Sequence, residues 1–102
     1  MKIETDKSAD EVLVTIEGDI DLYSSPELRK VLMAAVKKAP AGVGVHLGAV
    51  SYMDSSGVAT LVEGLRSAKE NDKSFTLIAP SHAVMKVLEL ARLDSIFEVR
   101  SV

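Results

Sequence analysis

The sequence contains no cysteine and no tryptophan, and aromatic residues make up 4% of its 102 positions. Without thiols the chain cannot form disulfides, thiolate metal sites or a cysteine nucleophile. So few aromatic rings provide no stacking platform for single-stranded nucleic acid. An excess of positive charge is also lacking, because 12 basic residues face 15 acidic ones and the formal net charge is −3. Nucleic acid is therefore not expected as a partner.

Long hydrophobic runs are absent as well. No apolar stretch reaches the roughly 18–20 residues of a membrane span. The first residues, Met1 to Asp6, alternate with charges and do not read as a signal peptide. We therefore expect a cytoplasmic protein with no direct membrane insertion. A chain of this length, with 47% hydrophobic and 26% charged residues, is expected to form one globular domain over residues 1–102.

Hydrophobic periodicity predicts alternating strands and helices. Residues 12–17 alternate in the manner of a strand, and residues 2–7 are a weaker partner strand. Apolar residues at helical spacing follow the capping sequence 24–27 and continue to Lys38, which predicts a first helix. A second helix is predicted from about Ser56 to Asn71, and a third begins after Pro80-Ser81. Short apolar runs at 42–47, 75–79 and 96–99 predict further strands. This order, ββαβαβαβ, predicts an α/β domain with a sheet that is parallel wherever a helix makes the crossover.

Two polar segments follow predicted strands, where ligands and partners usually meet a parallel sheet. We interpret both as loops: Gly18-Asp19-Ile20-Asp21, and residues 51–57, which end in Asp54-Ser55-Ser56-Gly57. A phosphate on a serine at the start of the following helix would meet unpaired backbone N–H groups, and it would add about −1.5 to −2 charge units. A plainer interpretation is that Ser55 or Ser56 is only the N-cap and Asp54 a turn residue.

Other chemistries fit the sequence less well. Asp19 and Asp21 could begin a calcium loop, but Lys30 and Ser24 occupy the positions that need glutamate and glycine. Carboxylates in an exposed loop are more often solvated acids than acid–base catalysts. Neither a Gly-x-Ser-x-Gly elbow nor a phosphate-binding Gly-x-x-x-x-Gly-Lys loop is present. We expect His46 to lie in the core or at its edge, and we expect neither an enzyme nor a cofactor or metal site.

The residues 50–58, Val-Ser-Tyr-Met-Asp-Ser-Ser-Gly-Val, resemble those of bacterial anti-sigma factor antagonists, members of the STAS domain family. The resemblance extends over the whole chain, including Gly18–Asp21 and the closing segment 87–97. It implies a STAS-type single domain, with a mixed, mostly parallel sheet of four to five strands and three helices mainly on one face.

The resemblance also implies a function in transcription regulation by partner switching. Such an antagonist binds an anti-sigma factor that is a serine kinase, and phosphorylation of the serine after the aspartate, Ser55 here, weakens binding. A separate phosphatase resets the switch. Asp19, Asp21, Asp54, Ser56 and Gly57 would lie with Ser55 on or near the docking face.

One departure and one alternative accompany this resemblance. The strand before the motif reads His46-Leu47-Gly48, where the family often has Asp-Leu-Ser. Other STAS domains regulate anion transporters or are subunits of lipid-trafficking ABC transporters. An ABC transporter ATPase or permease is therefore the alternative partner, and a stand-alone hydrolase is a distant third hypothesis.

Overall fold

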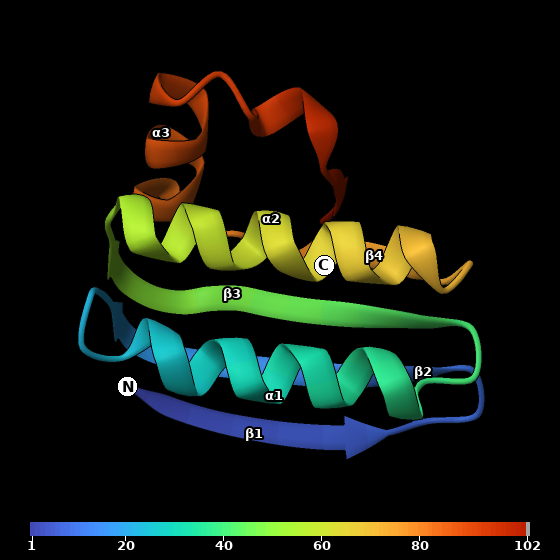
Figure 1. Cartoon of the computed structure of the whole chain (residues 1–102). Helices are drawn as coiled ribbons and strands as arrows, with labels where there is room; N and C mark the ends of the chain where they lie inside the picture. Colours follow the sequence, from blue (N-terminus) through green and yellow to red (C-terminus); the bar gives the residue numbers. More distant parts are fainter. Residues whose placement is uncertain (102) are drawn as a thin grey trace.

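The structure is a computed structural model that describes residues 1–101. Figure 1 shows the α/β order that the periodicity predicts. The strands are β1 (Lys2–Lys7), β2 (Glu11–Ile20), β3 (Gly42–Met53), β4 (Ser74–Ile78) and β5 (Glu98–Arg100). The helices are α1 (Ser25–Lys38), α2 (Ser55–Glu70), α3 (His82–Leu90) and the short 3-10 helix η1 (Asp94–Ile96).

The sheet has the order β1-β2-β3-β4-β5, so spatial order follows chain order. β1 runs antiparallel to β2, and each later pair is parallel. Because every parallel crossover advances in the same direction, right-handed connections place α1, α2 and α3 on one face. Figure 1 shows α1 and α2 lying over the sheet, with α3 next to the first turns of α2. The predicted mixed sheet and one-sided layer of helices are confirmed.

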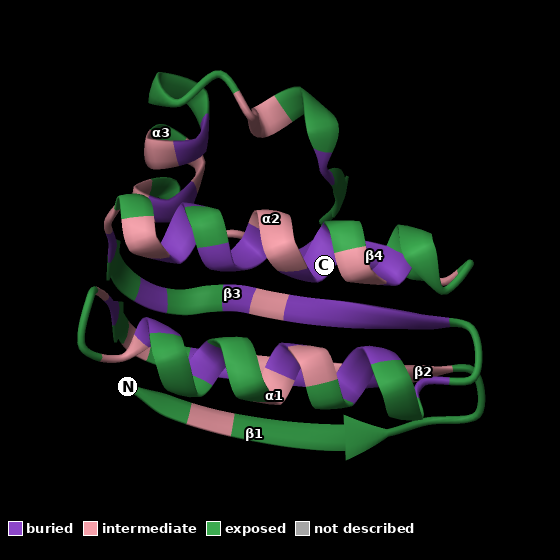
Figure 2. Cartoon of the chain, viewed as in Figure 1, coloured by how far each residue is buried: buried purple, intermediate pink, exposed green. Residues whose placement is uncertain are grey.

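The hydrophobic core lies between the sheet and this helix layer. In β2 the side chains of Val12, Val14 and Ile16 are buried, and the residues between them are only partly so. Figure 2 shows the same division on α1 and α2, whose buried sides face the strands. Leu32 and Leu61 are completely buried, and burial of one such side chain contributes about 1.5–3 kcal/mol.

The interpretation of both polar segments as loops is wrong, because residues 18–20 and 51–53 are strand and residues 55–57 belong to α2. β2 continues through Asp19 to Ile20, and β3 continues to Met53. Two irregularities in the β2–β3 register, between Thr15 and Glu17 and between Gly18 and Asp19, explain the error. They interrupt the alternation of apolar residues without ending the pairing.

Two further boundaries differ from the predictions. α2 begins at Ser55 rather than about Ser56, and the last strand occupies 98–100 after η1 rather than 96–99. The apolar Ile96 and Phe97 suggested strand, but Phe97 instead leaves η1 and turns into the core. Its ring centroid lies 6.4 Å from that of Phe75 in β4.

Among residues 1–101, no helix lies on the opposite face of the sheet. There, Arg100 of β5 reaches across β4 and β3 to Glu11 of β2, with 3.1 Å between Nη2 and Oε1. Gly44 lies beneath this ion pair, and a Cβ there would be 3.5 Å from Glu11 Oε1 and 3.6 Å from Arg100 Nη2. Both distances are ordinary van der Waals contacts, whereas Ile78 Cδ1 would lie only 2.7 Å from that Cβ, so the glycine makes room for the Ile78 side chain.

Candidate functional site

The predicted site residues gather where β2 and β3 end and α2 begins. We call this surface the serine edge and define it as residues 19–23 and 51–57. The N–H of Asp54 donates to the carbonyl of Ile20 at 3.1 Å, which joins the two segments. Parallel strands deliver both carboxyl ends to one edge of the sheet, so residues more than 30 positions apart become neighbours.

Asp54 is the N-cap of α2. One of its carboxylate oxygens, Oδ1, accepts the N–H groups of Ser56 at 2.9 Å and Gly57 at 3.3 Å. The Ser56 hydroxyl donates to the same oxygen at 2.5 Å. The plainer interpretation is therefore wrong about which residue caps the helix: the aspartate is the cap, and Ser55 and Ser56 are its first helical residues.

These contacts stabilise the charged form of Asp54. The Ser56 hydroxyl is the main group that lowers the pKa of this carboxyl below its ordinary value of 3.8. Burial of the carboxyl opposes the shift, and the N–H groups of Gly57, Ser56 and Leu22 reinforce it. Asp54 therefore stays ionised at the start of the helix.

Ser55 differs from its neighbours because its side chain is exposed. Among residues 1–101, its hydroxyl has no hydrogen-bond partner, whereas the Ser56 hydroxyl donates to Asp54 Oδ1. The side chain stands in the first turn of a 16-residue helix, whose amino end favours negative charge. An accessible hydroxyl in this position can accept a phosphate without first breaking a hydrogen bond of the domain.

Gly57 is buried, so its contribution to the site is to position α2. A Cβ at this position would lie 2.5 Å from Met53 Cγ and 2.9 Å from Ile20 Cγ2. Glycine thus allows the first turn of α2 to approach the ends of β2 and β3 closely. Without this approach, Asp54 and Ser55 would stand farther from the β2–α1 connection.

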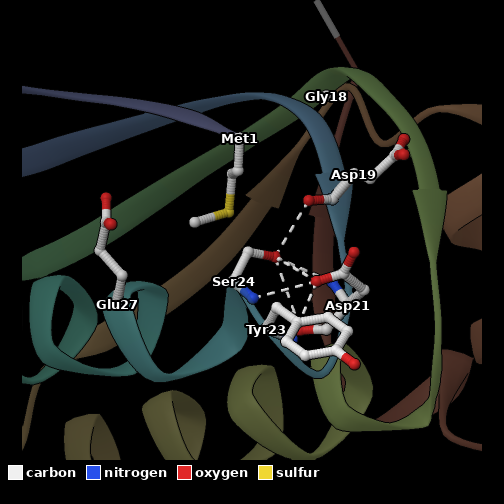
Figure 3. Close-up of a pocket in the computed structure, with 7 residues that line it drawn as sticks. All are labelled: Met1, Gly18, Asp19, Asp21, Tyr23, Ser24 and Glu27. Atoms are coloured by element: carbon white, nitrogen blue, oxygen red, sulfur yellow. Dashed lines mark hydrogen bonds between the residues drawn. The ribbon is translucent and has the colours of Figure 1, made fainter.

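Asp19 and Asp21 line an open hollow of about 590 Å³ with Met1, Ser24 and Glu27 (Figure 3). Asp19 is exposed, and Figure 3 shows its carboxylate pointing away from Asp21. Asp21 is held in the turn before α1, where Oδ1 accepts the N–H groups of Tyr23 and Ser24 at 3.0 Å each. The two acids therefore share one edge but differ in role, because only Asp19 has its carboxylate free of such bonds.

Sequence reasoning missed three large side chains on this edge. Leu22 is 68% exposed, Tyr23 92% and Tyr52 51%. Tyr23 and Tyr52 are the chain's two tyrosines, and both stand among polar residues rather than in an apolar stripe. That placement was the signal available in the sequence. Exposed tyrosines are typical of protein-binding surfaces.

The two histidines lie outside this arrangement. His46 is half-buried in β3, as expected for a residue at the edge of the core, and its Nδ1 accepts the N–H of Gly48 at 3.3 Å. His82 is exposed at the start of α3. Within residues 1–101 there is no cluster of three or more His, Asp or Glu side chains that could hold a metal ion. No helix of the same residues is long and apolar enough to cross a membrane.

Residues 1–101 form a compact α/β domain with a mixed sheet, in which the sequence Met-Asp-Ser-Ser-Gly connects β3 to α2. The chain belongs to the STAS family: residues 3–99 match the family model described as "Mlab, STAS domain".

Curated relatives and solved structures agree with this assignment. The chain is 31% identical over 99 residues to the anti-sigma-B factor antagonist of Staphylococcus epidermidis, covering 97% of this chain and 92% of the relative. An anti-sigma factor antagonist from Mycobacterium paratuberculosis superimposes with a TM-score of 0.86 at 22% identity, covering 97% of this chain and 84% of that one. The phosphorylated form of the Bacillus cell fate determinant SpoIIAA gives a TM-score of 0.78 at 19% identity, covering 99% and 91%.

Proposed function

We propose that this protein is a cytoplasmic anti-sigma factor antagonist that binds an anti-sigma factor serine kinase through the serine edge. Phosphorylation of Ser55 by that kinase ends the binding, and a separate phosphatase restores it. The names of the relatives and the shared fold support this role. In this role the chain is a binding module rather than an enzyme, and it requires no cofactor of its own.

The observation that carries the proposal is the free hydroxyl of Ser55. At the serine edge, the Asp54 carboxylate accepts hydrogen bonds from the Ser56 hydroxyl and from the Ser56 N–H at the start of α2. Ser55, in contrast, is exposed and has no hydrogen-bond partner among residues 1–101. A Bacillus relative of the same fold has been solved in a phosphorylated form. The modification is thus compatible with this architecture.

The phosphoryl transfer uses the chemistry of the kinase. The Ser55 oxygen attacks the γ-phosphorus of ATP, its proton passes to a base of the kinase, and the bond from phosphorus to the ADP oxygen breaks. ATP and Mg²⁺ belong to the partner. The contribution of this chain is to present the hydroxyl at the exposed first turn of α2.

Charge accounts for the release of the partner. A phosphate adds about −1.5 to −2 units to an edge that already carries Asp19, Asp21 and Asp54. In a desolvated interface, such like-charge placement costs several kcal/mol, and each 1.4 kcal/mol weakens affinity about tenfold. Leu22, Tyr23 and Tyr52 would supply the apolar contacts of the unmodified complex.

The test uses purified anti-sigma factor kinases of the source bacterium. Calorimetry with ADP present gives Kd for the wild type, Ser55→Ala and Ser55→Asp. We expect Ser55→Ala to bind and Ser55→Asp to bind at least about 100-fold more weakly. Ser8→Asp, an exposed serine in the β1–β2 turn at the opposite end of the sheet, is the matched control and should bind as the wild type does.

Mass spectrometry after incubation with Mg-ATP then locates the phosphate. A single phosphate on Ser55, absent from Ser55→Ala, supports the proposal. Equal affinity of the wild type and Ser55→Asp, or a phosphate on another residue, would overturn it. Binding only to a transporter ATPase or permease would instead assign the chain to the transporter-associated STAS domains.

A further inference from the structure

The start of α2 presents two adjacent serines, and exposure alone does not decide between them. Ser55 is exposed, and Ser56 is only partly buried, so both side chains are accessible at the first turn of the helix. Consecutive residues of a helix lie only about 1.5 Å apart along its axis. A further feature of the site must therefore determine which of the two hydroxyl groups receives a phosphate.

The side chain of Asp54 distinguishes the two serines. The Ser56 hydroxyl donates its proton to Asp54 Oδ1 at 2.5 Å, and the same oxygen accepts the Ser56 N–H at 2.9 Å. The Ser55 hydroxyl forms no hydrogen bond within residues 1–101. The carboxylate therefore holds the proton of one hydroxyl and leaves that of the other free.

Ser56 is also held on its other side by Thr60. The carbonyl of Ser56 accepts the Thr60 hydroxyl at 2.8 Å, and Thr60 is buried one turn further along α2. Side chains thus bind Ser56 at its N–H, its hydroxyl and its carbonyl. A movement of Ser56 toward a kinase active site would break these bonds, whereas the Ser55 side chain can turn without breaking any hydrogen bond of residues 1–101.

Phosphoryl transfer requires that the serine oxygen lose its proton. The oxygen bonds to the γ-phosphorus, the proton passes to a base of the kinase, and ADP leaves. In Ser56 the proton points at Asp54 instead of a kinase base, and the ionised carboxylate would repel the negatively charged γ-phosphoryl group. At Ser55 the bond to the carboxylate does not exist, so the proton can be transferred to the kinase.

We propose that Asp54 is a positioning residue that directs the kinase to Ser55, because its carboxylate holds the hydroxyl of Ser56. This inference rests on the proposed function and adds how one of two adjacent serines is selected. The selection also protects the start of α2. A phosphate on Ser55 leaves the three hydrogen bonds of Asp54 Oδ1 in place, whereas a phosphate ester on Ser56 has no proton to donate and would remove one of them.

The first experiment removes the carboxylate in chains that carry Ser55→Ala. Each variant is incubated with the anti-sigma factor kinase and Mg-ATP, and mass spectrometry locates the phosphate. Ser55→Ala alone should remain unphosphorylated. Addition of Asp54→Ala should produce a phosphate on Ser56 with at least about ten times the signal of Ser55→Ala, because a hydrogen bond to a charged group no longer has to be broken. Asp10→Ala, which removes an exposed aspartate of the β1–β2 turn, is the matched control and should produce none.

A second variant separates the charge of Asp54 from the integrity of the helix start. In Asp54→Asn the amide oxygen can still accept the N–H groups of Ser56 and Gly57, but its bond to the Ser56 hydroxyl is no longer charge-assisted and is therefore weaker. We expect amide exchange at Ser56 and Gly57 to stay slow while Ser56 acquires a phosphate, at a lower rate than in Asp54→Ala. Fraying of the helix alone would not give this combination.

The outcomes separate this inference from the proposed function. If the kinase modifies Ser55 in the wild type, a phosphate on Ser56 while Asp54 is intact, or none on Ser56 once Asp54 is replaced, overturns the role of Asp54 alone. Modification of Ser56 only in Asp54→Ala, together with fast amide exchange there, also overturns it. A wild-type chain that the kinase does not phosphorylate on Ser55 overturns the proposed function, and the role of Asp54 falls with it.

Discussion

The starts of α1 and α2 use the same residue types, but only the start of α2 has a serine hydroxyl that is exposed and forms no hydrogen bond within residues 1–101. Each start has one aspartate and two consecutive serines: Asp21 with Ser24 and Ser25, and Asp54 with Ser55 and Ser56. Before α1 the Ser24 hydroxyl accepts the N–H of Asp21 at 2.9 Å, and Ser25 is buried. At α2 the aspartate caps the helix itself, so one serine remains free.

The spacing between the aspartate and the serines, rather than the composition, therefore decides which hydroxyl is accessible. Two residues separate Asp21 from Ser24, and the chain uses them to form a turn closed by the aspartate and the serine. Asp54 is adjacent to Ser55, so its carboxylate reaches the N–H groups of the first helical turn directly. Ser55 then points to solvent as the first residue of α2.

Asp54→Ala should break the α2 start and have the largest effect on stability. The helix would lose the cap that serves Ser56 and Gly57, and we expect a loss of about 1.5 kcal/mol in the free energy of unfolding. Urea denaturation at pH 7 measures it. Asp10→Ala, an exposed aspartate in the β1–β2 turn, is the control and should change stability by less than about 0.5 kcal/mol.

Asp54→Ala also tests how the stability of the α2 start depends on pH. The pKa of Asp54 is lower in the folded chain than its ordinary 3.8, so ionised Asp54 stabilises the fold above that value. The contribution decreases as the pH falls below about 4 and is lost once the pH passes below the folded pKa. The stability difference between wild type and Asp54→Ala should therefore shrink between pH 5 and pH 2; a constant difference would contradict the charge-based account of this cap.

Ser24→Ala should damage the α1 start to a smaller degree, by about 1 kcal/mol. It removes the acceptor for the Asp21 N–H and the hydroxyl that lies 3.1 Å from both the Asp19 carbonyl and Asp21 Oδ1. Thermal unfolding followed by circular dichroism measures the loss. Because Ser24 sits in the turn before α1, we also expect faster amide exchange at Tyr23 and Ser24 but not at Ser56.

Ser55→Ala should have the smallest effect, less than about 0.5 kcal/mol, because this hydroxyl makes no hydrogen bond within residues 1–101. Denaturation of Ser55→Ala beside Ser56→Ala measures the contrast. Ser56→Ala removes the hydroxyl that contacts Asp54 and should cost about 1 kcal/mol. A Ser55→Ala loss as large as that of Ser56→Ala would show that Ser55 stabilises the helix, and the accessible-hydroxyl argument would fail.

The sequence predicted the element order and most of the core because α1 and α2 have regular apolar stripes. It could not predict where β2 and β3 end. The irregularities near Gly18 and Gly48 place polar residues in paired strands, and period-two reasoning recognises only regular strands. The cap of α2 was ambiguous for a related reason. The prediction considered Ser55 or Ser56 as the cap and Asp54 as a turn residue, but aspartate is as strong an N-cap residue as serine, and the type of residue alone did not show which of them caps the helix.

The partial cover of α2 by α3 was beyond the sequence for a different reason. Val62 of α2 is partly buried and packs against the core. How far α3 extends over it depends on the nine-residue length of α3 and on the path of the chain after Ala91, neither of which is encoded in the α2 stripe.

The agreement between strand order and chain order bears on how the molecule assembles. Each strand pairs with the one made just before it, so a chain emerging from the ribosome can add every new strand to an edge that already exists. No strand has to wait for a later one to fill a gap beside it. The contact between Arg100 and Glu11, 89 positions apart, can form only once β5 has paired with β4, because the Arg100 side chain then reaches back over β4 and β3.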